Sequence, residues 1–195
     1  MPLKAEITHE GIRASVGAIP TAMRKNIRKA ISVALISLVR EVKTRTYPAS
    51  GLHVRTGALR RSVVPGPIEE GKSFIRGQVL VGQNLPYAMI HEYGGEIRPK
   101  NASYLTIPLA AVKTPAGVAR FRARDAEAYG YQTFVRNRVI FGSRDGRIVP
   151  LFALKSSVKI PARPFFRPAI KAKQHEIVQL LVKALRSTAE EVRRE

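Results

Sequence analysis

Four histidines are the side chains of this 195-residue chain best suited to acid–base or metal chemistry at neutral pH. They are far apart in the sequence, and none forms an HxxxH pair or stands beside a cluster of carboxylates: His9, His53, His91 and His175. His91 precedes Glu92, but the second histidine that a metalloprotease helix needs is missing. The chain has no cysteine, which excludes thiolate zinc sites, disulfides and a cysteine nucleophile.

The acidic residues are too few and too scattered for a nuclease-type magnesium site. Only Asp125 and Asp145 are aspartates, and the pairs Glu69–Glu70 and Glu190–Glu191 are typical of solvated surface charge. The chain has no GxGxxG, GxxxxGK[ST] or GxSxG motif. We therefore expect no catalytic residue, no metal and no cofactor, and we predict that the protein is not an enzyme.

Positive charge is the strongest feature of the composition. The chain has 34 lysines and arginines against 14 acidic residues, a net charge of +20, which implies an acidic neighbour, either nucleic acid or an acidic protein. The densest segment, 111–163, has 11 basic and 3 acidic residues, and basic residues alternate there with apolar ones. This pattern predicts hairpins with one charged face, and the alternative is a solvated hairpin. The candidate contacts with DNA or an acidic partner are Arg120, Arg122, Arg124, Arg136, Arg138 and Arg144.

Two long helices are expected near the ends of the chain. Apolar residues recur every three or four positions from Met23 to Val42, which predicts an amphipathic helix from about Pro20 to Arg45. Tyr47-Pro48 should end it, and a short helix over about 12–19 should precede it. The segment Pro161-Ala162-Arg163-Pro164 should lead into a final helix that runs almost to the end of the chain.

The segment between these helices is predicted to be mostly β-structure. Strands are expected at 74–82, 104–109, 138–142 and 147–154, and Asp145-Gly146 is typical of a hairpin turn. Further short strands are expected near 3–8, 62–64 and 158–160, with Pro65-Gly66-Pro67 ending the second of them, and a short helix is expected at 87–93. Residues 111–135 are ambiguous.

These elements predict an α+β fold. A mostly antiparallel sheet should pack against the long N-terminal and C-terminal helices, with a basic β-hairpin elaboration. We expect a single domain over 1–195, with 111–157 as the basic hairpin or arm within it. The longest uncharged apolar stretch, Ile31 to Val39, is far shorter than the ~20 residues that span a bilayer, so no membrane contact is expected.

Three ordered motifs add a family resemblance. They are TGALRRS at 56–62, YAMIHEYG at 87–94 and IPARPFFRP at 160–168. In this order they resemble TGxLRxS, YAxxxExG and xPARPFxxP of the tailed-bacteriophage neck or tail-completion proteins, also called head–tail joining or phage virion morphogenesis proteins. The likeness covers about residues 10–190, and 111–157 is its least typical part.

The resemblance implies a structural function in the virion. Such proteins form rings where the DNA-filled head meets the tail, so we expect a homo-oligomeric ring of six subunits at the neck, assembled in the cytoplasm of the host bacterium. Expected partners are other neck or connector proteins and tail-tube or tail-terminator proteins, with passing DNA as a further contact. The alternative function is a basic nucleic-acid-binding protein, although the chain has no RNA-binding RNP pattern, zinc finger or clear helix-turn-helix.

The motif residues supply candidate subunit and partner contacts. Arginines can pair with acidic groups, and aromatic side chains are enriched at interfaces. Each candidate also has a purely structural interpretation: a solvated charge, packing of a short helix on its own core, or a hydrophobic staple that takes one phenylalanine into the core. The candidate interface residues are Arg60, Arg61, Tyr87, His91, Glu92, Tyr93, Arg163, Phe165 and Phe166.

Overall fold

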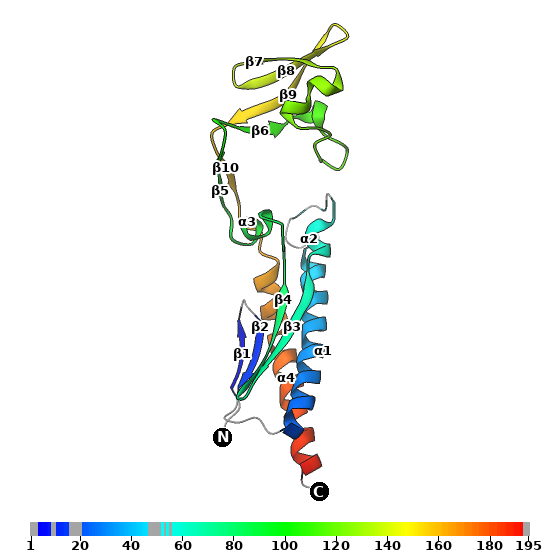
Figure 1. Cartoon of the computed structure of the whole chain (residues 1–195), viewed down its shortest axis with the longest axis vertical. Coiled ribbons are helices and arrows are strands. Elements are labelled where there is room, and N and C mark those ends of the chain that lie inside the picture. The colour runs from blue at the N-terminus through cyan, green and yellow to red at the C-terminus, as the bar shows by residue number, and fades with distance from the viewer. Residues whose placement is uncertain are drawn as a thin grey trace. The chain divides into compact units, whose positions relative to one another are not determined.

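The chain has an α+β fold whose helices and strands fall into two compact units (Figure 1). The structure is a computed structural model, and it describes residues 4–8, 11–15, 21–46, 52, 54 and 56–192. The first unit combines the N-terminal 93 residues with residues 162–195, and the second unit comprises residues 94–161. The predicted α+β class, with antiparallel sheets and long helices near both ends, is confirmed.

The first unit contains a four-stranded antiparallel sheet in the order β1-β2-β4-β3. Its strands are β1 (Lys4–Thr8), β2 (Gly11–Ser15), β3 (Val64–Gly71) and β4 (Phe74–Leu80). Its helices are α1 (Thr21–Arg45), α2 (Ala58–Arg61), α3 (Tyr87–Tyr93) and α4 (Phe166–Val192). The long helices α1 and α4 pack against each other, and α1 also packs on β4 (Figure 1).

The apolar stripe of α1 forms the centre of this core. Ile27, Ile31, Leu35, Leu38 and Val42 recur at helical spacing and are all buried. A Cβ atom at Gly77 of β4 would lie 2.6 Å from Ile31 Cγ2 and 2.8 Å from Leu35 Cδ1. β4 therefore approaches α1 so closely that only glycine fits at this point.

Two local predictions in this unit are wrong. Residues 11–15 form strand β2 rather than the start of a helix, because Ile12 pairs with β1 on one side and with Gly77 on the other. Val16 and Ile19 of that predicted helix, and the Tyr47-Pro48 stop, lie outside the described residues. Pro65 also does not end its strand. β3 continues to Gly71 through a register shift, since an edge strand tolerates the missing N–H of proline.

The second unit contains a two-stranded ladder and a four-stranded antiparallel sheet in the order β6-β9-β8-β7. The ladder pairs β5 (Gly95–Ile97) with β10 (Val158–Ile160). The sheet consists of β6 (Leu105–Pro108), β7 (Gln132–Arg136), β8 (Val139–Arg144) and β9 (Arg147–Lys155). Its buried core residues are Val112, Phe121, Ala126, Leu151 and Phe152.

Two tight hairpin turns connect β7, β8 and β9. Asp145 and Gly146 have φ values of 52° and 73°, which confirms the predicted Asp-Gly turn. Asn137 and Arg138 have φ values of 51° and 59°, and they form a second two-residue turn between Arg136 and Val139. The ambiguous residues before β7 form short 3-10 turns at 110–112, 123–125 and 127–129.

The predicted basic elaboration over 111–157 lies inside the second unit. The prediction of one domain stays a prediction, because two compact units of one chain can still unfold as a single cooperative structure.

Candidate interaction surfaces

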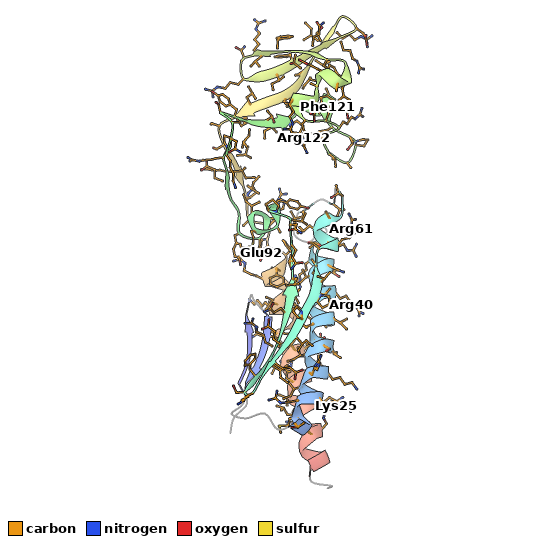
Figure 2. All side chains as sticks on the ribbon, in the orientation of Figure 1. Lys25, Arg40, Arg61, Glu92, Phe121 and Arg122 are labelled. Atoms are coloured by element: carbon orange, nitrogen blue, oxygen red, sulfur yellow. The ribbon has the colours of Figure 1, made fainter. Side chains whose placement is uncertain are left out.

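The carboxylate of Glu92 binds the first turn of α4. Its Oε2 accepts hydrogen bonds from the backbone N–H groups of Phe165 at 2.8 Å and Phe166 at 2.9 Å. Its Oε1 accepts from the backbone N–H of Arg167 at 3.0 Å and from the Arg167 Nε at 3.1 Å. The first N–H groups of a helix have no partner within the helix, and a negative charge there is favourable. Glu92 therefore joins α3 to α4 (Figure 2).

Further contacts strengthen this junction. Arg167 Nη2 donates to the backbone oxygen of Glu92 at 3.0 Å, and the guanidinium carbon of Arg167 lies 4.8 Å from the centre of the Tyr93 ring. The N–H of Arg163 donates to the backbone oxygen of His91 at 2.7 Å. Residues 91–93 and 163–167, which belong to two separate sequence motifs, thus form one network.

Hydrogen bonds keep Glu92 ionised although its side chain is buried, with 4% of the residue exposed. Burial alone would raise the pKa of Glu92. Hydrogen bonds from the backbone N–H groups of Phe166, Arg167 and Phe165 and from the Arg167 side chain together outweigh this effect, so the pKa of Glu92 lies below its ordinary 4.5. Four donors occupy both carboxylate oxygens. The arrangement suits a structural anchor better than a general base, which needs an oxygen within reach of a substrate.

The candidate interface residues therefore differ in accessibility. Glu92 and Phe165 are buried, and Phe166 packs against the first unit's core. Tyr87 and Tyr93 are exposed, at 37% and 49%, and the Tyr87 ring meets the ring of His91 edge-on at 5.9 Å. The exposed surface of α3 is thus available to a partner, whereas Glu92 and Phe165 serve the fold.

Local hydrogen bonds shape the TGALRRS motif. Thr56 Oγ1 accepts the backbone N–H two residues later at 3.3 Å, and Ser62 Oγ accepts the N–H of Gly82 at 3.0 Å. The first bond stays within the motif, and the second connects the end of α2 to the segment that follows β4. Arg60 and Arg61 remain exposed on that turn, and Figure 2 shows Arg61 at the surface.

The six candidate arginines of the second unit are all exposed. Arg124 Nε lies 3.7 Å from Asp125, and Arg144 Nε lies 3.6 Å from Asp145. Such exposed pairs contribute little stability. The other four form no ion pair with any residue that the structure describes: Arg120, Arg122, Arg136 and Arg138.

An aromatic cluster in the second unit was not predicted from the sequence. The Phe121 ring stacks on Tyr129 with 4.5 Å between centres and on Tyr131 with 5.8 Å. Arg144 lies over the Tyr131 ring at 4.9 Å and donates to the Tyr129 backbone oxygen at 3.3 Å. Arg144 thus also has a structural role. In the sequence, the two tyrosines of the Tyr-Gly-Tyr segment at 129–131 are the feature that could have indicated this aromatic cluster.

Within the part of the chain that the structure describes, no group of three or more histidine, cysteine or acidic side chains could hold a metal ion. Among the described helices, none combines the length and apolar character needed to cross a membrane. No protein-family model matches the chain, and neither a curated protein nor a solved structure matches it.

Proposed function

We propose that this protein is a structural component of the head–tail interface of a tailed bacteriophage, a tail-completion or neck protein that forms a homo-oligomeric ring. The observation that carries the proposal is the Glu92 junction, in which a residue of the second motif binds the backbone of the third motif 73 positions later. This contact gives a physical reason for the two motifs to occur together before a final helix. The proposed role is mechanical, so it needs no catalytic group.

Exposed aromatic surface supports self-assembly. Tyr87 and Tyr93 project from α3, beside a junction that fixes the start of α4. Aromatic side chains on rigid elements are effective interface anchors, because they bury a large area at a small cost in conformational entropy. A six-fold ring follows from the family resemblance and is part of the proposal.

The proposal is tested on particles made without this protein. Negative-stain microscopy should show separate full heads and tails, and supplying the protein should restore joined particles. Normal virions in its absence would contradict the proposal.

Ring formation has its own test in native mass spectrometry of the purified chain with its neck partners. Tyr87→Ser should reduce assembly, whereas Tyr104→Ser in the second unit is the matched control, because the two tyrosines are 37% and 39% exposed. Equal effects of both substitutions would argue against α3 as the subunit contact.

A second candidate function is nucleic-acid binding. The observation in its favour is that Arg120, Arg122, Arg136 and Arg138 are exposed without a carboxylate partner among the described residues. A gel-shift assay with duplex DNA at physiological salt separates the candidates. Tight binding by the isolated chain that weakens steeply with salt would favour this function, and weak binding would favour the structural role.

A further inference from the structure

The four-stranded sheet of the second unit has apolar side chains on both faces. Ile140, Val149 and Phe152 point to one face and pack with the core of this unit. Side chains alternate along a strand, so residues in the neighbouring register rows point to the opposite face. We call this the outer face, and its apolar residues are Leu105, Ile107, Phe134, Val139, Phe141, Ile148, Pro150 and Ala153.

The register places these residues next to one another. Phe134 pairs with Phe141, which pairs with Pro150, so the three form one row across β7, β8 and β9. The rings of Phe134 and Phe141 stack with 5.5 Å between centres and 15° between planes. Ile148 lies on the same face of β9, two residues before Pro150.

No core cluster that the described residues form covers the outer face. None of these eight apolar residues belongs to the buried cluster of either unit, and Ile148 and Phe134 are 62% and 43% exposed. The short turns of 110–129 contribute Val112 and Phe121 to the core, which packs with Ile140, Val149 and Phe152 of the opposite face. A contiguous apolar surface of this kind marks an interaction site or an aggregation liability.

The charged residues within the four strands of this sheet all have one sign, and the one acidic residue of its two hairpin turns, Asp145, lies 3.6 Å from Arg144. The strands β6, β7, β8 and β9 themselves contain no acidic residue. Their basic residues are three arginines and one lysine: Arg136, Arg144, Arg147 and Lys155. Arg136 and Lys155 point to the outer face by strand alternation, and Arg138 stands in the adjoining turn. The surface therefore has an apolar centre and a cationic border.

We propose that the outer face docks a partner protein whose contact surface has an apolar centre bordered by aspartates and glutamates. An apolar centre with a polar rim is the usual anatomy of a protein–protein interface, and opposite charges across the rim favour specific association. Duplex DNA fits less well, because surfaces that bind it are more polar and much more positively charged than protein–protein interfaces, and the centre of this face is apolar. A second copy would bring like charges together at the border.

This docking does not depend on the head–tail function, and site-specific photo-crosslinking tests it in the cells that produce the full-length protein. The crosslinker is placed by Phe134→p-benzoylphenylalanine or Ile148→p-benzoylphenylalanine. Tyr129→p-benzoylphenylalanine is the control, because Tyr129 is exposed but stacks on the core residue Phe121.

We expect positions 134 and 148 to crosslink to the same protein, at a segment that combines apolar and acidic residues, and position 129 not to reach it. Adding Arg136→Glu and Lys155→Glu should abolish that crosslink. With the identified partner purified, Phe134→Ser with Ile148→Ser should weaken binding by about tenfold or more. Arg120→Ser with Arg122→Ser should leave binding unchanged.

Crosslinks to nucleic acid or to a second copy would overturn the proposal, and so would no crosslink at either position or a crosslink that survives charge reversal. A crosslinked partner that is not a virion protein would support the docking surface while contradicting the neck function. Failure of the docking proposal and failure of the neck proposal therefore give different results.

Discussion

At the scale of single residues, Glu92 connects two helices of the first unit. A buried carboxylate is costly unless hydrogen bonds replace its hydration. Here four donors do so, and three of them are backbone N–H groups of the α4 terminus that would otherwise lack partners. The carboxylate thus accepts hydrogen bonds from the free N–H groups of α4, and these bonds in turn replace its hydration. Removing the charge of Glu92 should therefore affect both α3 and α4.

Glu92→Gln should destabilise the first unit. The substitution keeps the size of the side chain but removes its charge and aims an amide NH2 at backbone donors, so we expect a loss of about 1–3 kcal/mol in the free energy of unfolding. Urea denaturation followed by far-UV circular dichroism measures this loss. Glu96→Gln is the control, because Glu96 is exposed and pairs with Arg98 at the surface. If both variants lose equally little stability, the junction does not hold α4.

The pH dependence of stability provides a separate test of the same residue. The pKa of Glu92 is lower in the folded chain than its ordinary 4.5, so the unfolded chain binds more protons near that pH. The contribution of Glu92 should therefore be complete above about pH 5 and disappear as the pH falls through the folded pKa. The gap in unfolding free energy between the native protein and Glu92→Gln should narrow below pH 4.5. A gap that widens in acid would reverse the assigned direction.

At the scale of elements, the sequence predicted what local patterns determine. The α1 stripe, the α3 helix and the Asp145-Gly146 turn depend on neighbours within a few positions, and all three are confirmed. Strand β2 depends on pairing with β4, more than 50 residues later, and no local pattern encodes this partner. The same limit applies to Glu92. Its neighbours in sequence gave no indication that it binds α4, so it was predicted at a partner interface.

The turn between β7 and β8 contains local strain that a substitution can release. Arg138 has a φ of 59° at a position of a two-residue hairpin where glycine is favoured. Arg138→Gly should therefore raise the free energy of unfolding by about 0.5–1 kcal/mol. The backbone bond from Leu154 N–H to the Arg138 oxygen, at 2.7 Å, is kept. Thermal denaturation measures the change, and Arg138→Ala, which retains the Cβ, should give no gain. Equal gains from both would mean that loss of the arginine charge, not of strain, stabilises the turn.

At the scale of the whole molecule, charge and core are distributed over both units. The second unit contains 12 of the 34 basic residues and only 4 of the 14 acidic ones, so its surface is cationic in its own right. Each unit also has its own buried apolar cluster, and no residue belongs to both. From these separate cores we expect each unit to lose its packing without the other.

Independent cores predict independent local unfolding, which hydrogen exchange can measure region by region. Phe152→Ala removes a large, fully buried ring from the second unit, and a loss of about 3 kcal/mol or more is expected for such a cavity. Amides of β8 and β9 should then exchange much faster, while those of α1 and α4 should keep their protection. Leu35→Ala in α1 is the reciprocal variant, since Leu35 is buried in the other cluster. If either substitution lowers protection equally in both units, the chain unfolds as the single cooperative domain that its length predicts.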